Sequence, residues 1–449
     1  MIYDLAIIGA GPAGYVAAER AAKKGLKTIL FDKNKLGGVC LNEGCIPTKT
    51  LLYTAKLYES AKEGAKYGIL VDNVGFDFAK IMKRKDKVVK KLVGGVGAKM
   101  KNHGVDVVYG EARIKEQKSG EVRIEANDDL HSCKNLLVAT GSEAYVPPIP
   151  GLDREKIYTN KEILEIKDLP EELIVIGGGV VGTEFAGFFS SMGTKVTVIE
   201  MLPEILPGID TGFSSMLREE MEKKGIVFHL GARVTKVSEN MVTFVKNGTE
   251  SKVTGAKILV SVGRKPVTGG IGLEKLGVEL VNGAVKIDSR CRTNLPNVFA
   301  AGDVTGFSLL AHTASREGEV VVNNLSGRRD IMRYMAIPAV VYTNPEISSV
   351  GLTEQEAIKR KINHKVKSLP MAYAGRFVAE NEGKNGLCKI ITGEHDQLLG
   401  VHMIGNPSSE IIYGAAMAIE MQMRIRDIEE VVFPHPTVSE IFKETAFAF

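Results

Sequence analysis

Two of the five cysteines stand close enough in the sequence to act together. Four residues separate Cys40 from Cys45, and a regular helix rises about 7.5 Å over the five steps between them. A disulfide needs Cα atoms roughly 4.4–6.8 Å apart, so this pair can bond only where the chain leaves a regular helix, as Gly44 allows. We expect a redox-active dithiol. Two buried reduced cysteines or half of a metal site are the alternatives, although no further Cys or His cluster completes a zinc site.

Cys45 precedes the segment IPTKTLLYTAKLYE, whose pattern predicts a helix with Pro47 in its first turn. A cysteine at a helix N-terminus has a lowered pKa, because the helix dipole stabilises the thiolate. The apolar N-terminus lacks the basic region and cleavage site of a signal peptide, so we expect a cytoplasmic protein, in which structural disulfides are rare. This favours a catalytic pair. The isolated Cys133, Cys291 and Cys388 are expected to be buried apolar residues.

A histidine near the C-terminal end could act as a base on a thiol. His435 lies in FPHPTVSE, where Pro436 biases it toward an extended conformation. Thr437 and Glu440 match the T-x-x-E capping box of a helix start. A histidine–carboxylate pair working as a general base is one interpretation, and a surface histidine beside a capped helix is the other. The residues alone leave both open.

An internal repeat places two nucleotide-binding units around these residues. Residues 5–14 (LAIIGAGPAG) and 173–182 (LIVIGGGVVG) each run from an apolar strand into G-x-G-x-x-G. Each motif leads into a helical pattern, a stop glycine and a second strand that ends at an acid, Asp32 or Glu200. The two copies are offset by a constant 168 positions (177 − 9 = 168). The glycines are Gly9, Gly11 and Gly14 in the first copy and Gly177, Gly179 and Gly182 in the second.

The physics of this motif predicts two bound dinucleotides. The first glycine makes the turn, the second lets the backbone approach a pyrophosphate, and the third packs helix on strand. The helix N-terminus holds the phosphate charge, and the acid accepts hydrogen bonds from a ribose. A lone motif could be an ordinary βαβ turn, but two complete units argue against that. No Arg or Lys follows Glu200, so a 2′-phosphate would be repelled there, which favours NAD over NADP.

Composition excludes several other classes of protein. The formal charge is small, 58 − 54 = +4, and no basic cluster contains stacking aromatics, so nucleic-acid binding is not expected. No apolar run approaches the roughly 18 residues of a membrane helix. Apolar residues make up 44% and charged residues 25%, which is typical of a globular protein.

Four segments together resemble a known family. They are GGVCLNEGCIPTK (37–49), the two nucleotide units, VFAAGD (298–303) and HPTVSE (435–440), and they are similar to the flavoprotein disulfide reductases, which are pyridine nucleotide-disulfide oxidoreductases. Within that family the chain looks most like the members that oxidise dihydrolipoamide. The resemblance implies an α/β fold with two Rossmann-like dinucleotide-binding domains and a C-terminal α+β dimerisation domain. The domains would span 1–145 and 266–334 (FAD), 146–265 (NAD) and 335–449 (dimerisation).

The resemblance also implies roles for single residues. Cys45 would face the flavin, Cys40 would exchange with substrate, Lys49 and Glu184 would pair near the flavin's reactive nitrogen, and His435 with Glu440 would form the base. The NAD site would contain Gly177, Gly179, Val180, Val181, Gly182, Glu200, Val262 and Gly263. The FAD site would contain Gly9, Gly11, Pro12, Ala13, Gly14, Asp32, Lys33, Gly38, Lys49, Ala112, Ala139, Thr140, Gly141, Asp303, Leu310, Ala311 and His312.

The implied activity is oxidation of protein-bound dihydrolipoamide to lipoamide with NAD⁺, as the E3 component of a 2-oxo-acid dehydrogenase complex or of the glycine cleavage system. The implied partners are lipoyl domains or the glycine cleavage H protein, and a homodimer would lend His435 to the other subunit's site. The chain departs from the family pattern at Phe433 and Pro434, where His-Ala is usual, and at Val267, where Asn is usual. A glutathione reductase would carry arginines after Glu200, and a mercuric reductase would end in a cysteine pair. A non-catalytic flavoprotein is the rival from another class.

Overall fold

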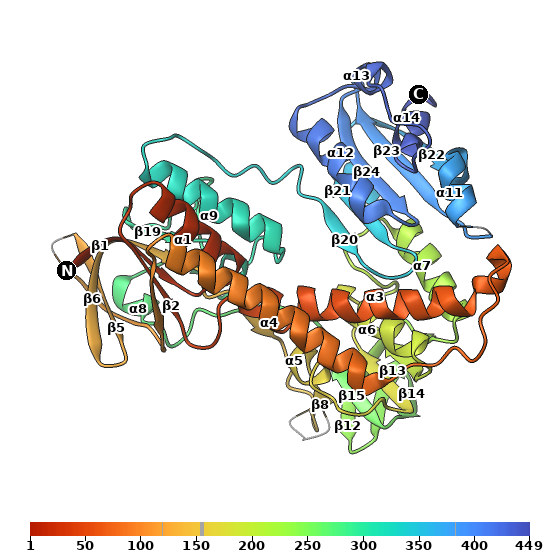
Figure 1. Cartoon of the computed structure of the whole chain (residues 1–449), viewed down its shortest axis with the longest axis horizontal. Helices are drawn as coiled ribbons and strands as arrows, with labels where there is room; N and C mark the ends of the chain where they lie inside the picture. Colours follow the sequence, from red (N-terminus) through yellow and green to blue (C-terminus); the bar gives the residue numbers. More distant parts are fainter. Residues whose placement is uncertain (119, 153–156, 382) are drawn as a thin grey trace.

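The computed structural model describes residues 1–118, 120–152, 157–381 and 383–449. Figure 1 shows the first nucleotide-binding unit on the left, the second unit below centre and the C-terminal domain at the upper right. Two long helices, α3 (Cys45–Lys62) and α4 (Phe78–Asn102), cross the middle of the molecule. The predicted α/β architecture is therefore present, and the interval between α3 and α4 is not helical apart from the 3-10 turn η1 (Gly64–Tyr67).

A mixed sheet, parallel around its central strand and antiparallel at β4 and β5, carries the first glycine turn. Its central strand β1 (Ile2–Ile8) pairs with β2 (Thr28–Asp32) and β6 (Asp129–Val138). The core residues of β1 are fully buried, as expected for a parallel strand covered on both faces. Helices α1 (Pro12–Lys23) and α9 (Ala311–Leu325) pack together beside the sheet. The other strands are β3 (Asp106–Tyr109), β4 (Arg113–Lys118), β5 (Glu121–Ala126) and β19 (Val298–Ala300), and β19 joins from the distant segment by pairing with β6.

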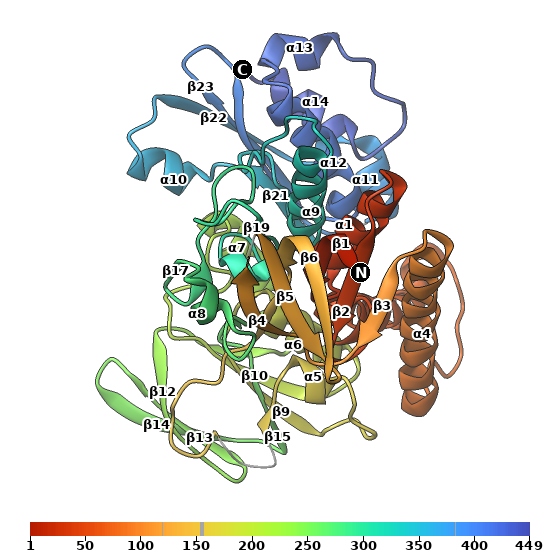
Figure 2. The ribbon, with the colours of Figure 1, turned by 90° about the vertical axis from the view of Figure 1, so that its left-hand side faces the viewer.

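The second unit repeats the first. β9 (Glu172–Ile176) leads through the glycine turn into α6 (Val180–Ser191) and then β10 (Lys195–Ile199), and the two strands pair in parallel. The sheet is completed by β8 (Ile157–Tyr158), β11 (Val227–His229) and β15 (Lys257–Val260), with helices α5 (Asn160–Ile163) and α7 (Thr211–Lys223). Beside it, β12 (Ala232–Ser238), β13 (Met241–Lys246) and β14 (Thr249–Thr254) form an antiparallel sheet, which Figure 2 places at the edge opposite α4.

The C-terminal domain is an antiparallel sheet with helices, an α+β arrangement. Its strands, in sheet order, are β20 (Ala339–Val341), β21 (Ile347–Gly351), β24 (Leu398–Ile404), β23 (Leu387–Gly393) and β22 (His364–Pro370). Its helices are α10 (Glu354–Lys359), α11 (Gly375–Glu380), α12 (Ser408–Glu420), α13 (Ile425–Glu430) and α14 (Glu440–Ala446), with the 3-10 turn η3 (Met371–Tyr373).

Short elements connect these parts. Strand β7 (Ser142–Ala144) pairs with β16 (Arg264–Pro266), so the two chain crossings between the units lie side by side. The others are α2 (Gly38–Asn42), α8 (Leu273–Leu276), η2 (Asp303–Thr305) and the ribbon β17 (Leu280–Val281)–β18 (Ala284–Val285). Among the described residues, none of the helices has the length and apolar character needed to span a membrane.

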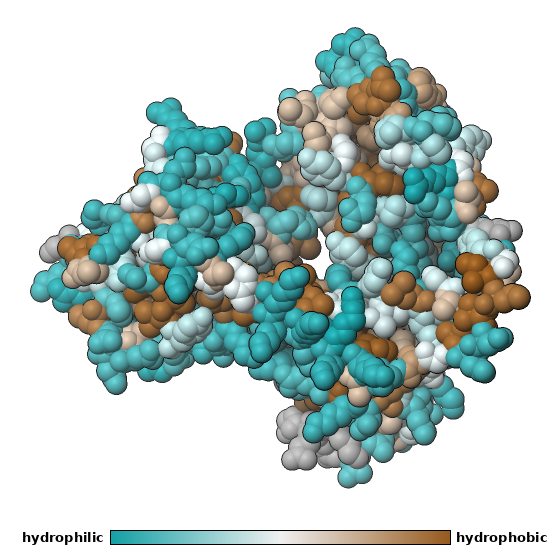
Figure 3. All heavy atoms as spheres, in the orientation of Figure 1, coloured by the Kyte–Doolittle hydropathy of each residue, from teal (hydrophilic) through white to brown (hydrophobic). Residues whose placement is uncertain are grey.

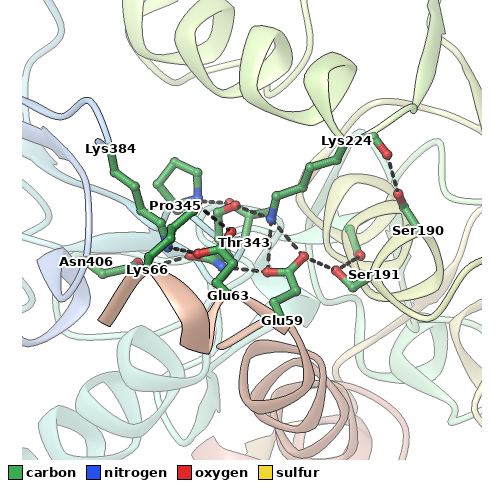
Figure 4. Close-up of polar contacts among 12 residues, drawn as sticks. Glu59, Glu63, Lys66, Ser190, Ser191, Lys224, Thr343, Pro345, Lys384 and Asn406 are labelled. Atoms are coloured by element: carbon green, nitrogen blue, oxygen red, sulfur yellow. Dashed lines mark hydrogen bonds and ion pairs between the residues drawn. The ribbon is translucent and has the colours of Figure 1, made fainter. Parts of the chain in front are cut away.

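One carboxylate joins three parts of the fold. Glu59, near the end of α3, accepts hydrogen bonds from Ser191 Oγ of α6 (2.6 Å), Lys224 Nζ after α7 (2.9 Å) and Asn344 Nδ2 of the C-terminal domain (2.7 Å). Figure 4 shows the side chains of Ser191 and Lys224 converging on it. Burial of the carboxyl opposes ionisation, but the nearby Lys224 charge and these hydrogen bonds outweigh it, so the pKa of Glu59 is lowered. The far end of α3 is therefore fixed to the second unit and to the C-terminal domain.

Candidate active site

The cysteine loop departs from a helix between its two thiols, as the spacing predicted. Cys40 lies in α2, Cys45 is the first residue of α3, and Glu43 (φ −136°, ψ 12°) and Gly44 (φ −145°, ψ −108°) between them are outside the helical conformation. Both cysteines are free and partly exposed, and their side chains are hydrogen-bonded to each other. Asn160 Nδ2 donates to the Glu43 carbonyl (2.7 Å), so the second unit also holds the loop. The isolated Cys133, Cys291 and Cys388 are buried, as expected.

The two thiols differ in acidity. The hydrogen bond from Cys40 lowers the pKa of Cys45 to about 7, with help from the Lys49 charge and against the effect of burial. The same hydrogen bond, together with burial, raises the pKa of Cys40. The helix start contributes a backbone hydrogen bond to Cys45, so the predicted effect of the helix N-terminus is present but smaller than that of Cys40. Cys45 is therefore the thiol that ionises first in the reduced pair.

Lys49 and Glu184 form the predicted ion pair. Lys49 lies one helical turn after Cys45, and its Nζ is 2.7 Å from Oε2 of Glu184, a carboxylate only 3% exposed on α6. Tyr342 donates its backbone N–H to the same carboxylate (3.0 Å), and its ring lies 4.7 Å from Lys49 Nζ. The pair thus joins the start of α3 to the second unit and to the C-terminal domain, as Glu59 does at the far end of α3.

The first glycine turn fits a dinucleotide. Gly9 has a φ of +104°, and a Cβ there would collide with the Ala139 carbonyl. A Cβ on Gly38 would collide with the backbone of Gly11, which keeps the two turns in close approach. Gly11 caps α1 without any side-chain hydrogen bond, so the N–H groups of the first turn remain available for a phosphate. Backbone approach and free N–H donors are what a pyrophosphate requires.

The acids that end the two strands are held identically. Asp32 accepts the N–H of Ala10 (2.7 Å) and of Asn34 (2.8 Å). Glu200 accepts the N–H of Gly178 (2.5 Å) and of Leu202 (2.7 Å). Each of these donors is offset by the same 168 positions (178 − 10 = 168 and 202 − 34 = 168). The repeat found in the sequence therefore extends to individual hydrogen bonds, and Gly177 has the same positive φ, +105°, as Gly9.

A polar network around Asp303 was not predicted from the sequence. Ser142 Oγ donates to Asp303 (2.6 Å), and Arg264 Nε donates to Ser142 Oγ (2.7 Å). Arg264 also approaches Asn160 (3.4 Å), the residue that holds the cysteine loop. Burial lowers the pKa of Arg264, and Asp303 opposes that effect. Ser142 and Arg264 lie 122 positions apart, and only the β7–β16 pairing brings them together, so no local spacing could have indicated the contact.

The remaining expected cofactor residues lie after strands or at helix starts of the two nucleotide-binding units. Ala112 follows β3, Ala139, Thr140 and Gly141 follow β6, and Leu310 to His312 form the start of α9. Pro12 and Ala13 open α1, Val180 and Val181 open α6, Lys33 follows β2, and Val262 and Gly263 follow β15. Most of these positions are at or just after the carboxyl ends of parallel strands, or at helix N-termini, where nucleotides bind in such sheets. Their roles remain predictions.

His435 and Glu440 form a pair, but away from the cysteines of the same chain. His435 Nδ1 lies 2.9 Å from Glu440 Oε1, and the histidine side chain is 79% exposed. Glu440 is the first residue of α14, which Figure 1 shows near the top of the C-terminal domain, whereas α3 runs below that domain. The predicted capping box is only half present. Glu440 accepts the N–H of Thr437 (2.9 Å), but α14 begins at Glu440 itself with Ser439 as its N-cap, and the Thr437 hydroxyl donates to the Pro434 carbonyl.

Residues 3–318 match the family described as pyridine nucleotide-disulphide oxidoreductase, and residues 337–446 match its dimerisation domain. The chain belongs to the pyridine nucleotide-disulphide oxidoreductase family. Members of this family use FAD and NAD(H), which agrees with the two dinucleotides expected from the glycine turns and with the FAD that the resemblance implied. The Cys40–Cys45 dithiol, which lies between the two glycine-turn units in the sequence, corresponds to the disulphide in the family's description.

Several relatives and solved structures are similar over nearly the whole chain. Dihydrolipoyl dehydrogenase of Bacillus subtilis (strain 168) is 40% identical, with 99% of this chain and 95% of the relative covered. Dihydrolipoyl dehydrogenase of Geobacillus stearothermophilus is 38% identical, with 98% and 94% covered. LpdA from Mycobacterium tuberculosis has a TM-score of 0.92 at 26% identity, with 100% and 99% covered. The HOCl-induced flavoprotein disulfide reductase RclA from Escherichia coli has a TM-score of 0.87 at 27% identity, with 99% of each chain covered.

Proposed function

We propose that this chain is a dihydrolipoyl dehydrogenase that oxidises protein-bound dihydrolipoyl groups with NAD⁺ through a Cys40–Cys45 disulfide. The observation that carries the proposal is the adjacent pair of free thiols in the α2–α3 loop, where Cys40 and the Lys49 charge lower the pKa of Cys45 to about 7 and the pKa of Cys40 is raised. A dithiol that passes electrons onward needs one thiolate directed at the acceptor and one thiol that exchanges with substrate. The match to each of three relatives with this name covers 94% or more of the relative's length.

In the exchange half-reaction the two substrate thiols are oxidised to a disulfide, and the Cys40–Cys45 disulfide is reduced to two thiols. One substrate sulfur attacks Cys40 of the oxidised pair, the Cys40–Cys45 bond breaks, and Cys45 leaves as a thiolate. The second substrate thiol then attacks the mixed disulfide, which releases lipoyl disulfide and leaves Cys40 reduced. The proton from the attacking thiol needs a base. Overall, dihydrolipoamide and NAD⁺ become lipoamide, NADH and one proton.

The chain's own residues prepare this step. Lys49 lies close enough to Cys45 to favour its thiolate, and Glu184 fixes the position of Lys49. Bound FAD supplies the two-electron transfer between the dithiol and NAD. We assign its pyrophosphate to the Gly9–Gly14 turn, its ribose to Asp32 and the ribityl side to Asp303, and we assign the NAD ribose to Glu200.

We infer that the base comes from a second copy of the chain. His435 is 79% exposed and directs Nδ1 to Glu440, which leaves Nε2 free to accept a proton from a thiol. Among the described contacts within one chain, none brings His435 to the cysteines. His435 lies in the dimerisation domain. A homodimer in which each C-terminal domain completes the other subunit's site accounts for both facts.

We further infer that the partners are lipoyl domains of a 2-oxo-acid dehydrogenase complex or the glycine cleavage H protein, and that the enzyme works in the cytoplasm. The relatives' name gives the substrate. The carrier protein differs from one complex to another, but the dithiol chemistry is the same for each.

Steady-state turnover tests the proposal. Purified holoenzyme is supplied with dihydrolipoamide and either NAD⁺ or NADP⁺, and reduction of glutathione disulfide by NADPH is measured in parallel. Fast reduction of NAD⁺ with dihydrolipoamide is the expected result, and Cys45→Ser is expected to abolish it. His435→Gln is expected to slow it by about 10²–10⁴-fold, the usual contribution of a positioned base. Flavin-containing protein that turns over glutathione disulfide but not dihydrolipoamide would contradict the proposed substrate.

A further inference from the structure

Helix α4 presents a face of lysines, and the helix's own carboxylate, Asp86, forms its ion pair with Lys85 (2.9 Å) and not with them. Lys83, Lys87 and Lys90 follow one another at i, i+4 and i+7, and Lys91 lies beside them. All four side chains are exposed, and none takes part in an ion pair among the described residues. The cations of α4 that do form ion pairs lie at other positions, such as Lys80 with Asp77 (3.3 Å). We call Lys83, Lys87, Lys90 and Lys91 the lysine face.

Two other exposed helices, α7 and α11, hold cations in ion pairs within the chain. On α7, Arg218 contacts Glu204 and Glu222, both at 3.0 Å, and Lys223 contacts Glu220 at 2.7 Å. On α11, Arg376 contacts Glu380 at 2.5 Å. The lysine face instead sets like charges at i, i+3 and i+4, a spacing that destabilises a helix. A feature that opposes folding and serves no contact inside the chain points to a ligand outside it.

The lysine face lies on the outside of the helix that packs against both cysteine-bearing elements. The opposite side of α4, with Ile81, Met82, Val96 and Met100, is buried against α3 and α2. Cys45 begins α3 and Cys40 lies in α2. Figure 2 shows α4 at the outer edge of the molecule, and Figure 3 shows hydrophilic side chains over the middle of the face where Figure 1 places it. A ligand on the lysine face is thus one helix away from the dithiol.

We propose that the lysine face docks an acidic carrier domain, which brings a protein-bound dihydrolipoyl group to Cys40. The inference rests on the proposed function, which requires a carrier protein. Its occupant is a folded acidic surface because the row from Lys83 to Lys90 extends about 10 Å along the helix at 1.5 Å per residue, longer than a single small anion. Free dihydrolipoamide is uncharged and gains nothing from these lysines.

Charge reversal on the lysine face tests the proposal. The triple variant Lys83→Glu, Lys87→Glu and Lys90→Glu is compared with a matched triple of exposed cations that form no ion pair among the described residues, Arg233→Glu, Lys236→Glu and Lys246→Glu, on β12 and β13. The substrates are free dihydrolipoamide and a recombinant acidic lipoyl domain in its dihydrolipoyl form. For the domain, the α4 variant is expected to raise KM at least about 10-fold, the low end of electrostatic steering. KM for free dihydrolipoamide is expected to stay unchanged in both variants.

Two further measurements separate docking from general effects. A lipoyl domain whose surface acids have been changed to amides is expected to show the same KM with the wild type and the α4 variant. Raising the salt concentration is expected to raise KM for the acidic domain in the wild type and not in the α4 variant, because salt screens exposed charges. Equal KM values for the acidic domain in wild type and α4 variant would overturn the docking proposal. Failure of the wild type to oxidise free dihydrolipoamide would instead overturn the proposed function.

Discussion

Glu200 occupies the same place in the second nucleotide unit as Asp32 does in the first. Each carboxylate accepts the N–H of the residue that follows the first glycine of its turn and the N–H of the residue two positions after itself. These bonds hold the carboxylate at the end of its strand, where a ribose is expected. The residues that follow Glu200, Met201 and Leu202, carry no charge to receive a 2′-phosphate.

This geometry predicts how cofactor preference can be changed. Glu200→Ala with Met201→Arg removes the repelling carboxylate and adds a cation at a position that is 61% exposed. A hydrogen bond to a charged group is worth roughly 1.5–3 kcal/mol, or about 10- to 100-fold in kcat/KM, so the ratio of NAD to NADP preference is expected to fall by at least that factor. Steady-state kinetics with both nucleotides measures it. Met201→Arg alone is the control and is expected to change the ratio much less. An unchanged ratio in the double variant would place the ribose elsewhere.

The acidity of Cys45 is predicted to depend on the side chain at position 40. Because the hydrogen bond from Cys40 is the largest cause of the lowered Cys45 pKa, Cys40→Ala is expected to raise that pKa, and Cys40→Ser, which keeps a donor, to raise it less. The alkylation rate against pH reports Cys45 alone in these variants, since the other cysteines are buried. The Cys40→Ala midpoint is expected at least about one pH unit above that of Cys40→Ser, given roughly 1.5–3 kcal/mol for such a bond. Coinciding midpoints would mean that the hydrogen bond does not set the acidity.

Lys49 and Glu184 are predicted to act on Cys45 in opposite directions. Lys49 lowers the pKa of Cys45 and Glu184 raises it. In the Cys40→Ser background, Lys49→Met is therefore expected to shift the alkylation midpoint up and Glu184→Gln to shift it down. Both changes are expected to reduce the free energy of unfolding by about 2–3 kcal/mol, less than the 3–5 kcal/mol of a fully buried pair because Lys49 is 31% exposed. Shifts of the same sign would show that the variants act through a general loosening of the site.

The sequence predicted the parts of this site that depend on local spacing. The glycine turns, the strand-end acids and the break between Cys40 and Cys45 follow from backbone geometry over a few residues, and the structure has each of them. The Ser142–Arg264 contact depends on two distant segments that meet only in the folded chain. The capping box is only half formed, since Glu440 accepts the Thr437 N–H but α14 starts at Glu440 and not directly after Thr437.

Glu59 is predicted to hold α3 against the second unit and the C-terminal domain. Its side chain is 17% exposed and accepts bonds from Ser191, Lys224 and Asn344 (Figure 4). Glu59→Gln leaves Lys224, which is 34% exposed, without its counter-charge, so unfolding is expected to become easier by about 1–2 kcal/mol. Denaturant unfolding at neutral pH measures this change.

Glu63, one turn further along the chain, provides the matched control. It contacts Lys66 (3.5 Å) and Lys384 (3.7 Å) at the surface, so Glu63→Gln is expected to change stability by less than about 0.5 kcal/mol. The pH dependence separates the two further. Because the folded-state pKa of Glu59 is lowered, its contribution is full above the ordinary glutamate pKa of about 4.3 and is lost as pH falls through the folded value. The stability gap between wild type and Glu59→Gln is therefore expected to close in acid. A gap that persists there would mean that the variant loses packing and not charge.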